Sequence, residues 1–199
     1  MDVKPHKLNI SDYRAIASLH CDNINQGFLA TLGVPFLTLL YEAIDTDSKS
    51  VLLVERVDSS VVGFVTGTRG LGRIYKQLLL KPLRLIYSLK ACILSPAKLY
   101  KIIEVLLISK DSDISSDLPK HELLSIVVNP AYQGGGHAEN LFNALCSHFR
   151  EEGASSFSIV VGSNLDRAHA FYTKMGSIPV KEIQVHKGAV SVVYVKDLS

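Results

Sequence analysis

Short runs of apolar and β-branched residues recur along the chain and predict seven β-strands. Asp58, Ser59 and Ser60 separate the second run from the third, which is typical of a hairpin turn. The last two runs flank Lys187 and Gly188 and predict a second hairpin. The seven runs cover residues 3–10, 50–57, 61–68, 123–128, 156–161, 180–185 and 190–195.

Between these runs, apolar residues recur at helical spacing, which predicts amphipathic helices. The first begins at Ser11, a favourable N-cap residue, and runs toward Asn23. The second begins at Pro35, because proline fits the first turn of a helix. Two later helices cover about 137–152 and 164–175. Strands and helices alternate, so we expect a mixed α/β fold with a largely antiparallel sheet flanked by helices.

The composition narrows the class of protein. With 199 residues, 47% of them hydrophobic, the chain is long enough for one domain with a sizeable core. A net charge of +2 argues against a nucleic-acid partner, since such proteins need many Lys and Arg contacts to phosphate. The three cysteines have no metal-type spacing, so no metal site is expected. No signal-peptide pattern or membrane-spanning run is found, and we expect a cytoplasmic protein.

A glycine-rich loop between a strand and a helix is the most informative segment. Gly134, Gly135 and Gly136 follow the strand that ends at Val128, and an amphipathic helix begins at about His137. Glycines allow positive φ angles and a close approach of a ligand to the backbone, and the unpaired N–H groups of a helix N-terminus bind anions. The dinucleotide-binding and P-loop patterns fail on glycine spacing and on the missing Lys-Ser/Thr pair. A diphosphate fits such a loop.

The loop also carries the pattern Gln-x-x-Gly-x-Ala, read from Gln133 through Gly136 to Ala138. This pattern resembles the central motif of the GNAT superfamily of N-acetyltransferases. The resemblance implies that acetyl-CoA binds here as co-substrate, with its pantetheine arm along the strand and its diphosphate held by loop amides. His137 stands where the family usually has an aliphatic residue, and its side chain would either donate to phosphate or lie on the helix surface. The implied coenzyme-binding residues are Ile126, Val127, Val128, Gln133, Gly134, Gly135, Gly136, His137 and Ala138.

A second stretch, from Asn164 to Gly176, is similar to a later motif of the same family, Asn-x-x-Ala-x-x-Phe-Tyr-x-x-x-Gly. It lies one strand after the loop helix, where the family has it. The resemblance implies that Tyr172 lies near the coenzyme sulfur and protonates the departing thiolate, since a phenol with a pKa of about 10 stays protonated at neutral pH. A core tyrosine is the alternative. Asn164 would contact the coenzyme, cap the helix, or do both.

An amine must lose a proton before it attacks a thioester, so a general base is expected near the acceptor. Glu122 begins the strand before the loop, and strand alternation would place it on one face with Leu124, Ile126 and Val128. Histone-acetylating members of the GNAT superfamily have a base glutamate at the corresponding place. Burial would raise its pKa toward neutrality. An exposed residue at a strand start is the alternative, and the adjacent His121 is a second candidate base.

About fifty residues stand between the third and fourth predicted strands, where the family usually has a short connection. Residues 73–110 are rich in Leu, Ile, Lys and Arg and predict two helices, so we place a helical insertion at about 70–119 of one acetyltransferase domain, 1–199. These helices could cover the sheet, lie on an anionic lipid surface, or steer a phosphorylated acceptor such as a nucleotide-linked amino sugar.

Together these features predict an acetyl-CoA-dependent N-acetyltransferase that acts on the primary amine of a small molecule, for which an amino sugar is one candidate. A coenzyme-A-binding sensor or interaction module without catalytic activity is the alternative. A membrane surface is a less favoured partner, and a homodimer stays open.

Overall fold

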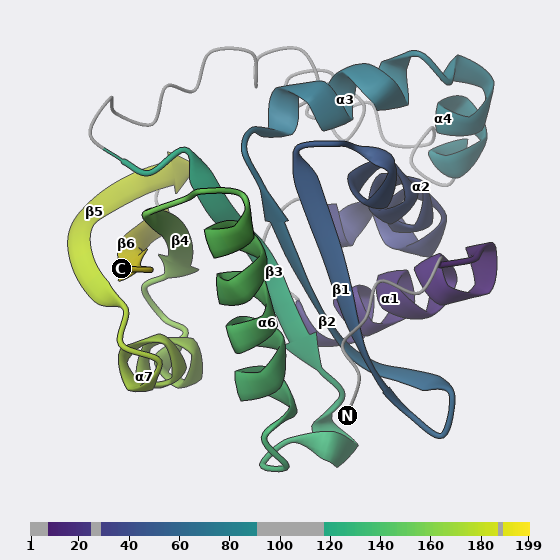
Figure 1. The fold of residues 1–199 in the computed structure, drawn as a ribbon. Helices are drawn as coiled ribbons and strands as arrows, with labels where there is room; N and C mark the ends of the chain where they lie inside the picture. Colours follow the sequence, from purple (N-terminus) through teal and green to yellow (C-terminus); the bar gives the residue numbers. More distant parts are fainter. Residues whose placement is uncertain (1–7, 25–28, 91–117, 187–188) are drawn as a thin grey trace.

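The computed structural model describes residues 8–24, 29–90, 118–186 and 189–199. Within these ranges, six strands form one sheet in the order β1-β2-β3-β4-β6-β5 (Figure 1). Only β3 and β4 pair in parallel, and the other neighbours are antiparallel. The predicted fold class is therefore confirmed. The strands are β1 (Ser50–Val57), β2 (Ser60–Thr68), β3 (His121–Val128), β4 (Ser156–Gly162), β5 (Ile178–His186) and β6 (Ala189–Asp197).

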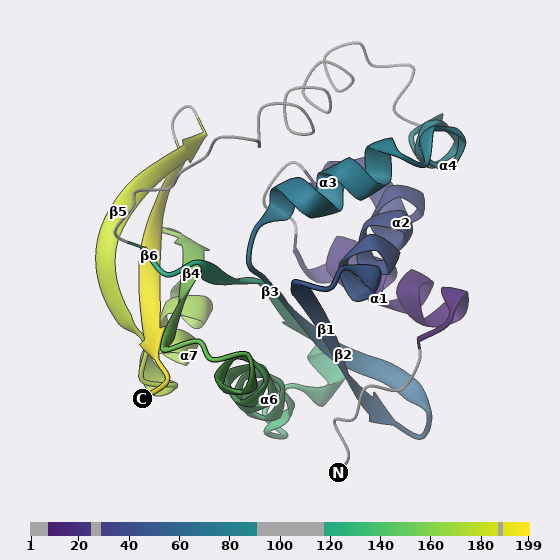
Figure 2. The same cartoon turned by 45° about the horizontal axis from the view of Figure 1, so that its top comes forward.

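Helices cover both faces of this sheet (Figure 2). Four helices, α1 to α4, lie on one face, whereas α6 and α7 lie on the other. They are α1 (Ile10–Asn23), α2 (Gly33–Thr46), α3 (Leu71–Leu79), α4 (Pro82–Ser88), α6 (His137–Glu151) and α7 (Asp166–Lys174), with short 3-10 turns at Leu29–Leu32 and Pro130–Tyr132.

Each face of the sheet has its own apolar cluster. Phe36 and Ile74 are fully buried in the cluster under α1, α2 and α3. Phe142 and Phe149 of α6 are fully buried in the cluster on the opposite face. The contact between α6 and β2 is close because Gly67 has no side chain: a Cβ atom there would come within 2.4 Å of Phe149 Cζ. A larger residue at this position would push α6 away from the sheet.

The prediction of a strand at 3–10 is wrong where the structure describes it. Ile10 already begins α1, and the N-cap is Asn9 rather than Ser11. The Asn9 side chain accepts hydrogen bonds from the N–H groups of Ser11 and Asp12, and the Asp12 carboxylate accepts one from the Asn9 N–H. This reciprocal capping box fixes a helical start and ends the extended backbone before Ile10.

The insertion begins directly after β2 with α3 and α4. Because the first predicted strand is not among the strands that the structure describes, the insertion lies between the second and third of these, rather than between a third and a fourth. The rest of the expected first strand, residues 3–7, and the later part of the insertion, residues 91–117, lie outside the described residues.

Strand β3 contains a bulge that changes its direction and its pairing with β4. Thr66 of β2 pairs with Ser125 and the next residue, Gly67, pairs with Leu123, so Leu124 is an extra residue on β3. A bulge of this kind bends its strand and exchanges the faces of the residues on either side. Accordingly, β3 pairs with β4 only over residues 121–123 and then diverges from it.

The bulge overturns the predicted alternation along β3. Ile126 and Val128 pack in the α6-side cluster, but Leu124 packs in the cluster under α1 and α2. Leu123 lies on the α6 side, so its neighbour Glu122 points to the opposite face. The prediction that Glu122 shares a face with Ile126 and Val128 is therefore wrong, because it assumed a regular strand.

Candidate active site

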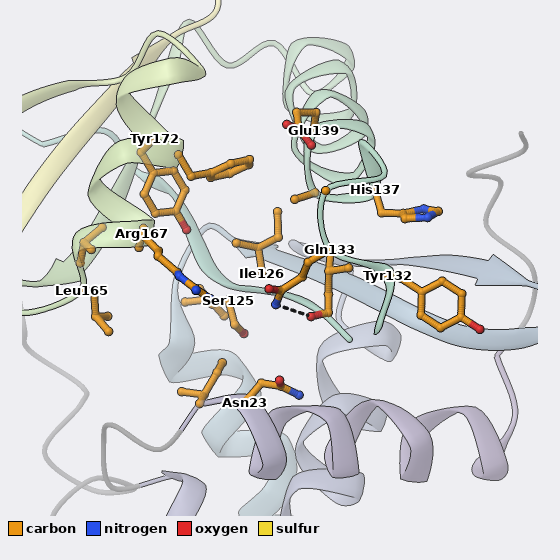
Figure 3. Close-up of a pocket in the computed structure, with 18 of the residues that line it drawn as sticks. Asn23, Ser125, Ile126, Tyr132, Gln133, His137, Glu139, Leu165, Arg167 and Tyr172 are labelled. Atoms are coloured by element: carbon orange, nitrogen blue, oxygen red, sulfur yellow. Dashed lines mark hydrogen bonds between the residues drawn. The ribbon is translucent and has the colours of Figure 1, made fainter. Parts of the chain in front are cut away.

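A cleft of about 520 Å³ opens where β3 and β4 separate. Its walls come from the end of α1, the free edge of β3, the loop before α6, and α7 (Figure 3). The cleft is lined by most of the residues predicted from the sequence, namely Ile126, Val128, Gln133, Gly134, His137, Ala138 and Tyr172. The remaining predicted residues do not line it: Glu122, Val127, Gly135, Gly136 and Asn164.

The chain leaves β3 through a turn that is fixed at both ends. The Asn129 side chain accepts a hydrogen bond of 3.0 Å from the Ala131 N–H at the start of the 3-10 turn. Gln133 Nε2 then donates to the Val128 carbonyl oxygen over 3.2 Å, which is the dashed line in Figure 3. The long Gln133 side chain thus ties the beginning of the glycine loop (residues 133–138) to the last residue of the strand.

Gly134 and Gly136 have φ angles of 82° and 81°, in the left-handed region that favours glycine. No heavy atom lies within 4 Å of the position that a Cβ would take at either residue, so space is open beside the backbone. Gly136 is the N-cap of α6, and its carbonyl accepts the first helical hydrogen bond, from the Asn140 N–H at 3.0 Å. The preceding amides, including that of Ala138, have no helical acceptor. They offer donors to an anion at the positive end of the α6 dipole.

The His137 side chain does not take the predicted position on the helix surface, whereas its donation to phosphate stays a prediction. It is buried, and its Nδ1 atom is 3.0 Å from Oε1 of Glu55, a buried carboxylate on β1. An ionised carboxylate can only accept a hydrogen bond, so Nδ1 is the donor. The prediction that this side chain lies on the helix surface is therefore wrong. Only its other nitrogen, Nε2, is left for a ligand.

Tyr172 is a core residue that also lines the cleft, and its catalytic role stays a prediction. Its side chain is 6% exposed, and its ring packs against the rings of Phe142, Phe171 and Tyr194. Its hydroxyl points into the cleft (Figure 3). Burial raises the pKa of the Tyr172 phenol above its usual range, so the hydroxyl stays protonated at neutral pH.

The later motif fits with a shift of one residue at its first position. Asn164 stands four residues before Ala168, whereas the motif has three, and Leu165 occupies the matching place. Leu165 is the N-cap of α7 and lines the cleft. Asn164 is exposed. The prediction that Asn164 caps the helix is therefore wrong, and its contact with the coenzyme stays a prediction without support from its position.

An ion pair joins the two helices that border the cleft. Lys174 Nζ of α7 is 2.9 Å from Glu139 Oε1 in the first turn of α6. The Lys174 side chain holds the pKa of the Glu139 carboxyl below its usual range. Glu139 lines the cleft, so this pairing balances a negative charge beside the glycine loop.

The two candidate bases lie in different surroundings. Burial raises the pKa of Glu122 to about 7, so this carboxyl changes its charge near neutral pH. Glu122 also contributes to a raised pKa of Tyr75, a buried residue of α3, which places the insertion near the carboxylate. Burial lowers the pKa of His121, whose ring packs on Phe149 under α6. His121 Nε2 is 3.4 Å from Glu152 Oε2 without hydrogen-bond geometry.

Several cleft residues were not predicted from the sequence. Asn23 and Ile24 come from the end of α1, and Ser125 follows the bulge in β3. Ser125 Oγ lies 3.0 Å from Thr66 Oγ1 and also contacts the Tyr41 hydroxyl. These residues belong to no motif, and only the three-dimensional arrangement brings them together.

A model of the acetyltransferase (GNAT) family matches residues 21–177 of the chain. The chain belongs to the GNAT family. The matched region contains β1 to β4, the glycine loop and α7, so it includes every wall of the cleft. The predicted family is thus confirmed.

Solved structures share the GNAT fold at low sequence identity. An N-acetyltransferase from Staphylococcus aureus Mu50 is 15% identical, with a TM-score of 0.60 and 96% of each chain covered. The ribosomal-protein-S18-alanine N-acetyltransferase from Escherichia coli is 11% identical, with a TM-score of 0.58. The match covers 98% of this chain and 92% of that enzyme. An aminoglycoside 6'-N-acetyltransferase complexed with coenzyme A is 11% identical, with a TM-score of 0.62 and coverages of 100% and 98%. No curated protein sequence matches.

Ion pairs join the helices of the insertion to α2 and to the residue that follows it. Arg73 of α3 pairs with Asp47 over 3.1 Å, and Lys81 and Arg84 both pair with Glu42 of α2. These three cations therefore have a structural role in holding α3 and α4. In the part of the chain that the structure describes, no cluster of His, Cys, Asp and Glu could hold a metal ion, and no helix there could cross a membrane.

Proposed function

We propose that this protein transfers the acetyl group of acetyl-CoA directly to a primary amine of a small molecule. The observation that carries the proposal is the glycine loop, where open backbone amides at the N-terminus of α6 border a cleft beside an unpaired strand edge. We treat residues 1–199 as one acetyltransferase domain with its insertion at about 70–119.

The coenzyme fits this arrangement in two parts. Within the described residues, the edge of β3 that faces β4 has no strand partner beyond residue 123, so the backbone of 126–128 can hydrogen-bond to the amides of the pantetheine arm. The amides of residues 133–138 lie at the end of that edge and suit a diphosphate. A side chain at Gly134 or Gly136 would fill the space that the phosphates need.

Two protons move when the amine nitrogen attacks the thioester carbonyl, the C–N bond forms and the C–S bond breaks. Glu122 does not line the cleft, so it accepts the proton of the amine through a bridging water; a carboxyl with a pKa of about 7 is partly ionised at neutral pH. Tyr172 donates a hydrogen bond to the departing sulfur. Its raised pKa favours donation over full proton loss, so solvent delivers the final proton to the thiol.

The acceptor enters at the other end of the cleft, the acceptor end, lined by Asn23, Ile24, Leu124 and Ser125. This surface combines apolar side chains with a carboxamide and a hydroxyl, which suits a small polar molecule rather than a long peptide. We place amino sugars, including nucleotide-linked ones, first among the candidates, since one structural neighbour is an aminoglycoside acetyltransferase. Another neighbour acts on a ribosomal protein, so peptides are the comparison class.

The test is release of free thiol from acetyl-CoA with a panel of amines: amino sugars, nucleotide-linked amino sugars, polyamines and short peptides. We expect turnover with at least one amino sugar, together with an N-acetylated product detected by mass spectrometry. Tight coenzyme binding without turnover on any amine would instead support the sensor or interaction module. No binding of coenzyme A would overturn the proposal.

A further inference from the structure

A buried hydrogen-bonded pair lies directly beneath the glycine loop. His137 Nδ1 and Glu55 Oε1 are 3.0 Å apart, and the side chains are only 10% and 4% exposed. Glu55 belongs to β1 and His137 to the first turn of α6, which are 82 residues apart in the sequence. The pair therefore connects the start of the loop helix to a strand that otherwise takes no part in the cleft.

The imidazole is packed against the backbone of the loop itself. A Cβ atom on Gly135 would come within 3.2 Å of both Cδ2 and Nε2 of His137, so the ring lies in contact with the middle of the turn. The Tyr132 ring meets it edge-on, with centroids 6.1 Å apart. Glu55, Tyr132 and Gly135 thus enclose the ring on three sides, and little freedom is left for the backbone that carries it.

The position of Glu55 follows from the pattern of its strand. Val51 and Leu53 of β1 pack in the cluster on the α6 side, and alternation places Glu55 on the same face. The neighbouring residue, Arg56, points the other way and forms an ion pair of 2.7 Å with Asp12 of α1. Glu55 is therefore held by its strand in a fixed position, from which it can orient a residue on α6.

Leaving this carboxylate unpaired would be unfavourable for an anion site. A buried carboxylate without a partner is strongly destabilising, and its charge would repel a diphosphate bound close by. The Nδ1–H group of His137 gives the Glu55 carboxylate a hydrogen-bond partner. The pair can thus hold the loop and also satisfy the buried carboxylate.

We propose that Glu55 and His137 are positioning residues for coenzyme binding: their hydrogen bond fixes the amides of residues 133–138 in the geometry that grips the diphosphate. This inference rests on the proposed function, because it assumes that coenzyme A binds at the loop. The loop is then held at two points. Gln133 fastens its beginning to Val128, and His137 fastens its end to Glu55.

The test measures the Kd for coenzyme A by calorimetry, well below the unfolding temperature of each variant. Glu55→Ala should raise the Kd about tenfold or more, which corresponds to the loss of one well-placed charged hydrogen bond. His137→Asn should stay within about threefold of wild type, because the Asn amide nitrogen replaces Nδ1 as the donor to Glu55. In turnover, the KM for acetyl-CoA should rise in Glu55→Ala, while kcat at saturation stays within about twofold.

A double variant keeps the test valid if Glu55→Ala does not fold. Replacing both residues with leucine removes the two hydrogen-bonding groups together and fills the space, so the protein should fold and still bind coenzyme A about tenfold more weakly than wild type. Wild-type affinity in a folded double variant would overturn the positioning role and leave the proposed function standing. Failure of the wild-type protein to bind coenzyme A would overturn both.

Discussion

The anion-binding end of the cleft and its acceptor end are built in different ways. At the first, the proposed recognition groups are backbone amides of residues 133–138, and the glycines there leave room for a ligand. At the second, the groups are side chains such as those of Asn23 and Ser125, which come from α1 and from the bulged part of β3. A site made of backbone groups suits the coenzyme, which is the same for every acceptor. A side-chain site can change with the acceptor while the fold is kept.

This difference has a practical consequence. Substitutions at the anion-binding end should act through charge and backbone conformation, and they should affect coenzyme binding for every acceptor. Substitutions at the acceptor end should change the KM for one acceptor and leave the KM for acetyl-CoA unchanged. The following experiments test this separation.

The largest effect is expected from a negative charge in the glycine loop. Gly134→Asp places a carboxylate in the open space beside Gly134, and Asp tolerates positive φ better than most residues. Repulsion by two phosphate charges should cost about 4 kcal/mol, so coenzyme affinity should fall on the order of 1,000-fold by calorimetry.

Gly153→Asp is the matched control for that variant. Gly153 has φ of 79°, open space at its Cβ position, and a place just after the other end of α6. Both variants should lose similar stability, but only the Gly134 variant should lose affinity. Equal losses of affinity would show that backbone strain, rather than an anion site, explains the result.

Tyr172→Phe should give the next largest effect. Removing the hydroxyl should lower kcat about 300-fold, because the departing sulfur loses the hydrogen bond that stabilises its charge, while the Kd for coenzyme A stays within about twofold. Tyr13→Phe is the control, because the Tyr13 hydroxyl bonds to Asp45 and Tyr13 does not line the cleft. A kcat unchanged in Tyr172→Phe would leave this residue a purely structural role.

Glu122→Gln should lower kcat/KM about 100-fold at pH 8 and remove its pH dependence. In the wild type, kcat/KM should rise with pH through about 7, because only the ionised carboxyl can accept the proton. Exposed Glu182 on β5 supplies the control variant Glu182→Gln, which should keep the wild-type profile. A wild-type profile that is flat between pH 6 and 8 would argue against Glu122 as the base.

The same carboxyl should affect stability with a defined sign. Its folded-state pKa of about 7 lies above the ordinary value of 4.5, so the folded state binds the proton more tightly. The stability that Glu122 contributes is therefore present at low pH and is lost as pH rises toward and through about 7. Glu122→Gln should melt higher than wild type at pH 8, and the difference should shrink as pH falls toward 5. Calorimetric melting at several pH values measures this.

The smallest effect is expected at the acceptor end. Asn23→Ala should raise the KM for the acceptor about fivefold, the loss of one hydrogen bond, and leave the KM for acetyl-CoA unchanged. Ser18→Ala, which removes an exposed hydrogen bond to Asp22 on the same helix, should change neither constant. A rise in the KM for acetyl-CoA in Asn23→Ala would contradict the separation of the two ends.

The backbone conformation of the glycine loop could be predicted from the sequence because it depends on neighbouring residues. A strand, three glycines and an amphipathic helix follow one another, and Gly134 to Ala138 lie where the pattern placed them. The position of His137 could not be predicted, since its partner Glu55 lies on a distant strand and looks in sequence like an ordinary strand carboxylate.

The acceptor side could be predicted less well for a similar reason. The bulge at Leu124 results from the pairing of β2 with β3, and no residue type in the sequence predicts it. It reversed the predicted face of Glu122 and separated β3 from β4, which made the cleft. Likewise, the capping box of Asn9 and Asp12 begins a helix at Ile10, where the apolar residues had predicted a strand.

The central claim is that backbone amides of residues 133–138 bind a diphosphate, and one comparison tests it most directly. Calorimetric titrations of the wild-type protein with coenzyme A and with pantetheine, which lacks the diphosphate, separate this contribution from the rest of the ligand. We predict binding of coenzyme A in the micromolar range, which is common for enzyme substrates, and binding of pantetheine at least about 100-fold weaker. Equal affinity for both ligands, or no binding of coenzyme A, would contradict the account.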